Sequence, residues 1–484
     1  MTSATPDIDP TSPPTWPQVR AAFQRIWGYP DFRPPQDAIV RSLLAGQDTL
    51  VVMPTGGGKS ICFQLPALLQ QGLTLVISPL VALMENQVQE LRERNLPAAT
   101  LHSDRPTHER RRVLQHLPRL RLLYLSPETL FTPKVWERLC QPDITLNGLI
   151  LDEAHCLVQW GETFRPAYRR LGTVRPALQA ATGASFAIAA FTATADPVAQ
   201  ATIAQVLGLK SPETVALSPY RPNLHLRVAQ VWTPQARRSR LRQFIDAHRG
   251  QTGLVYVRTR RDAEQVSSWL SSRHRVAAYH AGLGSQQRRH IEADWTGNRL
   301  QFVVCTSAFG MGVNKPDCRW VAHLHAPLLL SEYVQEVGRA GRDGKRAEAL
   351  TLVSDRFGWL DPQDKQRRQF FLRRMAAQRR EALALASKLP KRGDLRQVAQ
   401  EFKQGAVALS LLHAMGRLRW QDPFHYIMMA GAESSTTDMG TAAGQMQRYL
   451  YGRGCRWQGI LTGFGFGEEA VRCGHCDRCQ QNAQ

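Results

Sequence analysis

A glycine-rich loop contains the most recognisable chemistry in this sequence. Residues 53–60 read Met-Pro-Thr-Gly-Gly-Gly-Lys-Ser, and their apolar flanks predict a short buried strand before the loop and a helix after it. Glycines permit backbone conformations that turn several N–H groups toward one anion, and the helix N-terminus adds the positive end of its dipole. Lys59 is placed to reach the β- and γ-phosphates of a nucleotide, and the Ser60 hydroxyl to ligate Mg²⁺.

The loop as a whole is therefore predicted to bind a nucleoside triphosphate. The residues with this role are Thr55, Gly56, Gly57, Gly58, Lys59 and Ser60. The loop departs from the pattern G-x-x-x-x-G-K-[ST] at Met53, which stands where the first glycine would be. A glycine-rich turn that binds nothing is the alternative. The order of strand, glycines, Lys-Ser and helix argues against that alternative.

Two adjacent carboxylates follow another apolar run. Residues 148–151 read Gly-Leu-Ile-Leu and lead directly into Asp152-Glu-Ala-His155. An acidic pair at the end of a buried strand is unfavourable unless it meets a cation. Asp152 is predicted to hold Mg²⁺ through water, and Glu153 to polarise the attacking water. An exposed acidic turn is the alternative.

Two arginines three positions apart form a third candidate. Arg339 and Arg342 lie with Gln335 in residues 331–344, where glycines flank the arginines. Such arginines can reach across a cleft and neutralise the charge that grows on a transferred phosphoryl group. Solvent-exposed arginines are the alternative, and they leave the glycines and Gln335 unexplained.

Two aromatic segments are candidates for contacts with bases. Upstream of the loop, Tyr29 can stack on a base, Arg33 follows, and the Gln36 amide can both donate to and accept from an adenine edge; a simple Gly-Tyr-Pro turn is the alternative. Residues 159–170 interleave aromatic and basic side chains, which suits unpaired bases and phosphates. A small satellite core is an equally weighted alternative there. The candidates in this second segment are Trp160, Phe164, Arg165 and Tyr168.

The elements that must position these residues alternate between strand-like and helix-like segments. In the first half, strands are expected at residues 73–78, 120–126, 148–151 and 187–191, and helices at 80–94 and 107–117. After Pro219 the alternation resumes, with strands expected at 253–257, 276–280 and 302–306 and a helix at 262–270. This order predicts an α/β fold of parallel sheets, with ligands at the carboxyl ends of the strands.

Length and charge favour a multidomain protein that binds a polyanion. The chain has 484 residues, too many for one ordinary core, and its net charge of +21 points to nucleic acid. No apolar run of membrane-spanning length and no signal peptide occurs, so no membrane contact is expected. Five scattered cysteines suggest reduced thiols and a cytoplasmic protein. Residues 1–17, rich in Pro, Thr, Ser and Asp, are expected to be a disordered tail.

Together these motifs resemble the RecQ family of superfamily 2 DNA helicases. The segments that carry the resemblance are Phe32-Arg-Pro-Pro-Gln36, the loop at 53–60, Ser78-Pro-Leu-Val-Ala-Leu-Met84, Asp152-Glu-Ala-His-Cys156, residues 159–170, which we call the aromatic-rich loop, and Phe191-Thr-Ala-Thr-Ala195. With the arginine segment, the resemblance runs from about residue 23 to 353. One departure is Glu162-Thr163, where the family usually has His-Asp.

The resemblance implies two tandem RecA-like parallel-sheet domains, at residues 18–208 and 209–355, which bind ATP and Mg²⁺. It implies that Gln36 reads adenine and that the aromatic-rich loop couples single-strand binding to ATP hydrolysis. Gln335, Arg339 and Arg342 are expected to face ATP across the domain cleft, with Arg342 as the arginine finger.

The region after residue 355 is expected to be mostly helical. Residues 361–389 predict a basic helix, 394–402 and 406–415 two short helices, and 418–420 with 424–429 a β-hairpin around Asp422-Pro423. This order predicts a winged-helix-like insert at 356–440. As a hypothesis, Phe424 and His425 at the hairpin tip act as a strand-separating wedge, whereas Trp420 and Tyr426 are expected to fill the core of the insert.

A small zinc-binding module is predicted at residues 441–484. Its four cysteines have the spacing of a tetrahedral Zn²⁺ site, and disulfides are the weaker alternative in a reducing compartment. The ligands are Cys455, Cys473, Cys476 and Cys479.

The sequence thus predicts an ATP-dependent DNA helicase that acts in recombination and repair. By the family resemblance it moves 3′ to 5′, and it is expected to be a monomer that binds single-stranded and duplex DNA. An RNA helicase and an ATP-gated DNA-binding scaffold without strong unwinding are the alternatives. No protein partner can be named from the sequence.

Overall fold

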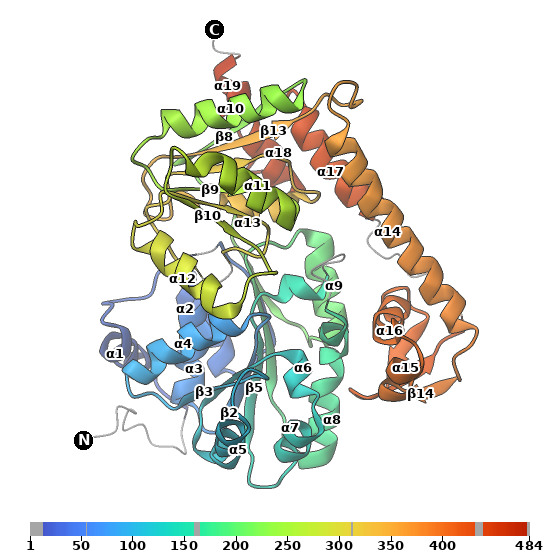
Figure 1. Ribbon diagram of the computed structural model, residues 1–484. Helices are drawn as coiled ribbons and strands as arrows, with labels where there is room; N and C mark the ends of the chain where they lie inside the picture. Colours follow the sequence, from blue (N-terminus) through green and yellow to red (C-terminus); the bar gives the residue numbers. More distant parts are fainter. Residues whose placement is uncertain (1–12, 55, 159–164, 311–312, 431–438, 482–484) are drawn as a thin grey trace. The chain divides into compact units, whose positions relative to one another are not determined.

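The chain folds into two compact units. The computed structural model describes residues 13–54, 56–158, 165–310, 313–430 and 439–481 (Figure 1). The first unit comprises residues up to 53, 57–217 and 375–436, and the second comprises 54–56, 218–374 and 437–484. Each unit contains a parallel sheet covered by helices, as the sequence predicted.

The first unit is organised around a seven-stranded parallel sheet. Its strand order is β3-β4-β2-β5-β6-β1-β7. The strands are β1 (Thr49–Val52), β2 (Leu73–Ile77), β3 (Ala98–Leu101), β4 (Leu122–Leu125), β5 (Leu146–Leu151), β6 (Ala187–Thr192) and β7 (Glu213–Ala216). Because β7 pairs with β1, this sheet extends beyond the predicted domain limit at residue 208.

Helices pack on both faces of this sheet. They are α1 (Trp16–Trp27), α2 (Gln36–Leu44), α3 (Lys59–Leu69), α4 (Val81–Glu93), α5 (Thr107–Gln115), α6 (Pro127–Leu130), α7 (Pro133–Leu139), α8 (Val174–Thr182) and α9 (Pro197–Leu207). Three short 3₁₀ segments accompany them, η1 (Leu117–Arg119), η2 (Ala154–Leu157) and η3 (Pro166–Thr173). Every residue of β2 is buried, as expected for a parallel strand covered on both sides.

The second unit contains a six-stranded parallel sheet in the order β10-β11-β9-β12-β13-β8. The strands are β8 (Leu224–Gln230), β9 (Gly253–Tyr256), β10 (Val276–Tyr279), β11 (Phe302–Cys305), β12 (Trp320–His323) and β13 (Ala347–Val353). The helices are α10 (Pro234–Ala247), α11 (Arg260–Ser271), α12 (Ser285–Thr296) and α13 (Leu330–Val337).

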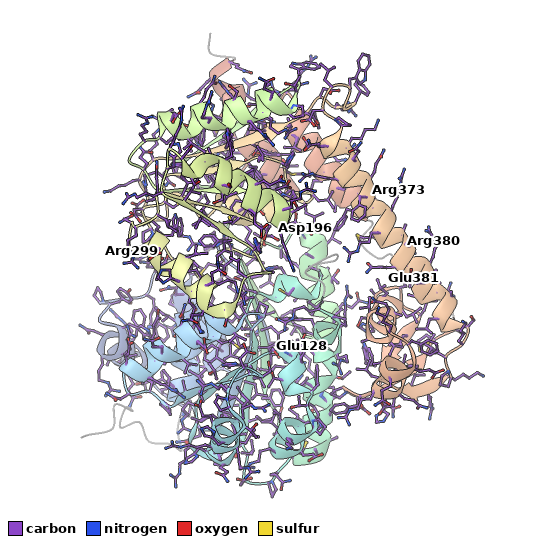
Figure 2. All side chains as sticks on the ribbon, viewed as in Figure 1. Glu128, Asp196, Arg299, Arg373, Arg380 and Glu381 are labelled. Atoms are coloured by element: carbon purple, nitrogen blue, oxygen red, sulfur yellow. The ribbon has the colours of Figure 1, made fainter. Side chains whose placement is uncertain are left out.

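The region after β13 has the predicted helical character and contains a winged-helix-like insert. The basic helix α14 (Gln363–Ala386) leads into β14 (Arg392–Asp394), α15 (Leu395–Glu401), α16 (Gly405–Ala414), β15 (Leu418–Trp420) and β16 (His425–Met428). The hairpin of β15 and β16 was predicted, and β14 adds a third antiparallel strand beside β16. Figure 2 shows Arg373 and Arg380 along α14.

The chain then returns to the second unit through α17 (Met439–Tyr451), α18 (Arg456–Gly463) and α19 (Asp477–Gln481). Cys455 immediately precedes α18, Cys473 and Cys476 lie before α19, and Cys479 lies on α19; α18 and α19 pack beside β8, the edge strand of the second sheet. The Trp457 indole N–H donates to the Leu224 carbonyl at 3.0 Å, and Asp477 Oδ2 accepts from the Val228 backbone N–H at 3.3 Å. Among the described residues, no helix is both long and apolar enough to cross a bilayer.

Candidate active site

The glycine-rich loop lies between β1 and α3, where a parallel sheet presents its carboxyl end. Gly56 and Gly58 have φ angles of 88° and 80°, in the left-handed region that favours glycine. A Cβ on Gly58 would lie 2.3 Å from Nε2 of Gln36, so a larger residue there would displace that side chain. Gly58 caps α3, which directs the N-terminus of that helix at the loop.

Lys59 and Ser60 are both held by neighbouring groups. The Lys59 ammonium is buried and donates to the Met53 carbonyl at 3.0 Å. The Ser60 hydroxyl accepts from Nε2 of Gln87 at 2.7 Å, and Gln87 is linked in turn to Gln64 and Tyr124. Gln87, which the sequence analysis did not single out, therefore orients the predicted metal-ligating hydroxyl.

The acidic pair follows β5, next to the loop. Asp152 is buried, and its Oδ1 accepts from the Glu153 backbone N–H at 3.0 Å. Glu153 has a φ of 52°, an uncommon conformation for a residue with a Cβ. Such backbone strain is concentrated at functional sites, where the surrounding structure maintains it.

A histidine connects this acidic pair to the next strand. His155 Nδ1 lies 3.2 Å from Oε2 of Glu153 and 3.1 Å from the hydroxyl of Thr192, the last residue of β6. Thr192 belongs to the Phe191-Thr-Ala-Thr-Ala195 segment. Although burial lowers it, the pKa of His155 is raised to about 10, chiefly by Cys156 and Glu153.

The surroundings of Asp152 fit a cation. Burial and the nearby charge of Glu153 raise the pKa of Asp152 to about 7, while Lys59 opposes the shift. A divalent cation bound beside a buried carboxyl group stabilises its ionised form and so lowers its pKa. The Ser60 hydroxyl and the Asp152 carboxylate are oxygen donors of the kind that Mg²⁺ prefers.

Of the predicted base-binding residues, Gln36 contacts the phosphate loop directly. Tyr29 is half exposed and its ring centroid is 5.9 Å from that of Phe23. Gln36 is buried; its Oε1 accepts from the Arg33 backbone N–H at 3.0 Å, and its Nε2 donates to the Gly57 carbonyl at 3.0 Å. Gln36 thus ties the base-binding segment to the phosphate loop, and its contact with adenine stays a prediction.

The predicted arginines of the second unit lie just after α13, and Gln335 lies on that helix, half buried. Arg339 is buried and donates to the Gly310 carbonyl, and Arg342 donates to the Val313 carbonyl and to Oδ1 of Asn314, each at 3.2 Å. Burial, together with the charge of Arg339, lowers the pKa of Arg342 to about 10.

A buried charge network fixes α13. Glu336 accepts from Arg258 at 2.8 Å and lies 2.9 Å from His323 Nε2. Although burial raises it, the pKa of Glu336 is lowered to about 2 by Arg258 and His323. Sequence reasoning did not assign this network, because its three residues lie in three separate segments of the second unit.

The aromatic-rich loop is only partly described, since Trp160 and Phe164 lie outside the described residues. Arg165 pairs with Glu128 and donates to the Pro79 carbonyl at 2.6 Å. Tyr168, which we expected to offer a ring to DNA, is fully buried in the core of the first unit. Its ring is therefore unavailable for base stacking in this structure.

The tip of the predicted wing is docked on the first unit. The Phe424 ring packs edge-on against Trp136, with centroids 5.5 Å apart, and also contacts Phe131. Nearby, Arg170 donates to the Pro423 carbonyl at 2.8 Å and the Ser410 hydroxyl to the Pro166 carbonyl at 3.1 Å. These contacts hold the insert against η3 and do not support Phe424 as an exposed wedge.

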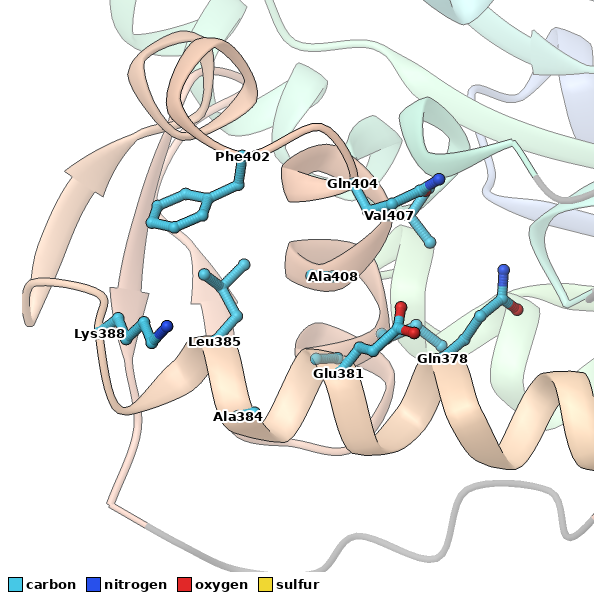
Figure 3. A pocket seen from close by; sticks show the side chains of 11 residues that line it. Gln378, Glu381, Ala384, Leu385, Lys388, Phe402, Gln404, Val407 and Ala408 are labelled. Atoms are coloured by element: carbon cyan, nitrogen blue, oxygen red, sulfur yellow. The ribbon is translucent and has the colours of Figure 1, made fainter.

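Other expectations for the insert hold. Trp420 and Tyr426 are buried in its core, and the His425 side chain is half exposed beside Asp422. A groove of about 260 Å³ lies between α14 and the segment of α15 and α16 (Figure 3). Leu385, Phe402 and Val407 contribute much of its apolar lining, and it contains no predicted site residue.

The four C-terminal cysteines converge as predicted. Their sulfur atoms all lie within 4.8 Å of one another, with 3.9 Å between Cys455 and Cys476 and 4.0 Å between Cys473 and Cys479. A Zn²⁺ ion with four Zn–S bonds of about 2.3 Å has S–S separations of about 3.8 Å, so the cluster fits it. The Cys473 backbone N–H donates to the Cys455 sulfur, which suits a thiolate. All nine cysteines have free thiols.

Comparisons with known proteins agree with this geometry. Residues 33–202 match the family model of the DEAD/DEAH box helicases, and residues 236–344 that of the helicase conserved C-terminal domain. The chain is 51% identical to the ATP-dependent DNA helicase RecQ of Synechocystis, over 95% of this chain and 98% of that protein. The chain belongs to the RecQ family of ATP-dependent DNA helicases.

Other RecQ relatives match a shorter part of the chain. The RecQ of Haemophilus influenzae is 37% identical over 71% of this chain, which corresponds to 55% of its own length. The Bacillus subtilis protein RecS is 39% identical over 69% of this chain and 66% of that protein. These two matches are far shorter than the match to Synechocystis RecQ.

Solved structures with the same fold are helicases. Mycobacterium smegmatis Lhr bound to ssDNA and AMP-PNP superposes with a TM-score of 0.57 at 20% identity, covering 88% of this chain and 61% of Lhr. The helicase MrfA bound to DNA gives a TM-score of 0.59 at 17% identity, covering 87% of this chain and 63% of MrfA. At these identities the likeness establishes the RecA-like fold.

Proposed function

We propose that this protein couples ATP hydrolysis to movement along one DNA strand, 3′ to 5′, and thereby unwinds duplex DNA in recombination and repair. The observation that carries the proposal is the arrangement of Lys59, Ser60, Asp152 and Glu153 at the carboxyl end of the first sheet, in a member of the RecQ family. A phosphate-binding loop beside two carboxylates provides the groups that phosphoryl transfer requires.

In this mechanism each residue of the first unit has one task. Lys59 leaves the Met53 carbonyl and binds the β- and γ-phosphates, while the loop N–H groups and the α3 dipole hold the remaining phosphate oxygens. Ser60 and Asp152 would hold Mg²⁺, which neutralises phosphate charge when bound. Glu153 orients the attacking water and accepts its proton. Tyr29, Arg33 and Gln36 bind the adenine.

The second unit supplies positive charge in the transition state. We assign this task to Arg339 and Arg342, with Arg342 as the arginine finger and Gln335 as a positioning residue. Both arginines contact backbone carbonyls in this structure, and phosphate oxygens would replace those acceptors as negative charge grows on the transferred phosphoryl group. The Arg258–Glu336–His323 network keeps α13 in place during this exchange.

Contact with a single strand is assigned to the aromatic-rich loop, through Trp160, Phe164 and Arg165. His155 joins Thr192 to Glu153, so we infer that a shift of the segment around Thr192 on DNA binding would reach Glu153. The four-cysteine cluster would hold Zn²⁺, which supplies folding energy to the C-terminal module. We further propose that a monomer acts on single-stranded and duplex DNA.

Duplexes with different single-stranded tails provide the direct test. We expect ATPase activity to rise with single-stranded DNA, and a 3′-tailed or forked duplex to be unwound faster than a 5′-tailed one. Lys59→Ala is the matched control, because it damages only the phosphate cradle. ATP hydrolysis without unwinding of any duplex would favour the scaffold, and unwinding of RNA but not DNA would favour an RNA helicase.

A further inference from the structure

An exposed aromatic turn connects the second helicase sheet to α14. Within residues 357–370, four large apolar side chains face solvent: Phe357 is 64% exposed, Trp359 81%, Leu360 62% and Phe370 67%. Monomeric proteins rarely leave several large apolar side chains together on the surface without a binding role. None of these residues belongs to the helicase motifs. We refer to residues 355–360 as the aromatic turn.

The backbone of the aromatic turn is fixed by one carboxylate. Asp355 is buried; its Oδ1 accepts from the Phe357 backbone N–H at 2.9 Å and its Oδ2 from the Trp359 backbone N–H at 2.8 Å. Between them Gly358 has a φ of 68° and donates its N–H to the Asp355 carbonyl. The two rings therefore project from an ordered turn, which reduces the entropy lost when a ligand binds.

The turn is also mounted rigidly on the second sheet. Arg237, on α10, donates to Asp361 at 2.9 Å and to Asp364 at 2.8 Å, and it also contacts the Leu324 and Leu352 carbonyls. Asp364 accepts a further bond from the Ser354 backbone N–H and lies 2.8 Å from His325 Nδ1. This buried network fixes the start of α14.

These contacts determine the charge that the segment shows to solvent. Asp355, Asp361 and Asp364 are all used internally, so none of them offsets the neighbouring cations. Arg356 and Arg373 are exposed, and Figure 2 labels Arg373 on α14. Phe370 precedes Arg373 by three residues, so both lie on one face of α14. The surface therefore combines aromatic rings with positive charge.

We propose that the aromatic turn, with Arg356, Phe370 and Arg373, is a binding platform for single-stranded nucleic acid, separate from the helicase motifs. Phe357 and Trp359 stack on unpaired bases, and the arginines contact the phosphates. Stacking platforms beside cationic side chains are the usual means of holding a single strand without sequence preference. A duplex hides its base faces in the helical stack, so this surface favours single strands.

The same charges argue against a second copy of the chain as the occupant. A twofold interface brings the same patch of both partners together, so the Arg356 and Arg373 cations of two copies would share one interface. Juxtaposed like charges disfavour such an interface. The negative phosphates of a nucleic acid complement these arginines instead.

The test measures binding without ATP, so it does not depend on helicase activity. A fluorescent oligothymidylate of about 20 nucleotides exceeds a single site of roughly 4–16 nucleotides. We expect the double variant Phe357→Ala and Trp359→Ala to bind it about tenfold more weakly than the parent. Val471→Ala, which truncates an equally exposed apolar side chain in the second unit, serves as the control and keeps parental affinity.

Two further measurements locate the contact. Ultraviolet crosslinking of a bromouracil-substituted strand should label the peptide that contains Trp359. Arg356→Gln should reduce the salt dependence of binding by about 0.7 in the logarithmic slope, the contribution of one single-strand phosphate. Basal ATPase activity and zinc content report that each variant is folded.

Unchanged affinity of a folded double variant, together with no label at Trp359, overturns the proposal. Loss of binding to anionic lipid vesicles with unchanged oligothymidylate binding also overturns it and assigns the turn to a membrane surface. A shift from dimer to monomer with unchanged oligothymidylate binding overturns it in favour of self-association.

Discussion

Lys59 in the first unit and Arg339 and Arg342 in the second unit are held in the same way, on backbone carbonyl oxygens. The two units share one type of parallel sheet, yet their strand ends differ. In the first unit Asp152 and Glu153 lie near Lys59. In the second unit the nearest carboxylate on α13, that of Glu336, is paired with Arg258 and His323.

This difference shows how one fold can serve two tasks. Carboxylates, a hydroxyl and a glycine loop give the first strand ends the groups that a triphosphate and its metal require. In the second unit the carboxylates near the arginines are paired elsewhere, Glu336 with Arg258 and Asp343 with Arg319, which suits Arg339 and Arg342 to donate positive charge. A substitution in the first unit should therefore change binding or hydrolysis, whereas one in the second should change hydrolysis alone.

The largest effect is expected at Glu153. Glu153→Gln keeps the shape of the side chain but removes the base, so kcat for ATP hydrolysis should fall by about two to four orders of magnitude. Binding of ATP, measured with a fluorescent analogue, should remain near the parental value. Glu109→Gln, on the exposed helix α5, is the control. A variant that hydrolyses ATP at the parental rate would show that Glu153 is not the base.

Arg342 provides the matching test in the second unit. Arg342→Ala should lower kcat by roughly two to three orders of magnitude, the usual effect of losing one donor to a transition state. The KM for ATP should change little, because the contact forms mainly as charge develops. Arg299→Ala removes an exposed arginine of the same unit as a control (Figure 2). A raised KM with unchanged kcat would instead assign Arg342 to ground-state binding.

The cysteine cluster should affect stability more than chemistry. Because structural zinc contributes folding energy directly, Cys476→Ser or removal of metal with a chelator should destabilise the second unit by several kcal/mol. Thermal unfolding followed with metal analysis is the measurement. Cys140→Ser, outside the cluster, should leave both values unchanged. Parental stability in protein shown to lack zinc would contradict this role.

A smaller effect is expected where the insert docks on the first unit. Phe424→Ala removes a partly buried ring that packs against Trp136, and the loss of that packing should cost about 1–2 kcal/mol. His425→Ala, on the same hairpin but half exposed, should stay within about 0.5 kcal/mol. Two outcomes would make the hairpin tip a candidate wedge again. Either the two substitutions destabilise the protein equally, or they impair DNA unwinding without changing stability.

The smallest effect concerns pH. Burial, with the nearby charge of Arg169, lowers the pKa of His413 on α16 from 6.5 to about 4. As pH falls, His413 therefore gains a proton in the unfolded chain before it does so in the folded protein. The free energy of unfolding decreases as pH falls from 6.5 toward 4. At pH 5.5 the loss should be about 1 kcal/mol. In His413→Gln, denaturation between pH 7 and about 5 should depend less on pH; an unchanged pH dependence would contradict the assignment.

Local patterns were sufficient to place the candidate residues of the first unit at the ends of their strands. The glycine loop and the Asp152–Glu153 pair are contiguous in sequence, and each sits at a strand end that its own apolar run predicts. Three of the four clustered cysteines, Cys473, Cys476 and Cys479, are equally local. In contrast, Gln87 orients Ser60 from an ordinary position in α4, and nothing in its neighbours distinguishes it from a solvent-facing glutamine.

The errors arose where the partners of a residue are far away in sequence. The Phe424 ring was expected to be exposed because a hairpin tip usually is, yet its partners Phe131 and Trp136 lie on a distant part of the first unit. Tyr168 lies among arginines that suit nucleic acid, but its ring completes the core below η3. Strand β14 has three residues and no periodic pattern to reveal it.

The cysteine module has a second consequence, which concerns solubility. The strand β8 forms one edge of the second sheet, and an uncovered edge is a template for pairing with another chain. Here Asp477 accepts from the Val228 backbone N–H, and Trp457 donates to the Leu224 carbonyl. Both side chains lie in the segment whose fold depends on the four cysteines. Loss of the metal should therefore uncover the edge of β8, so that the metal-free protein aggregates through strand pairing.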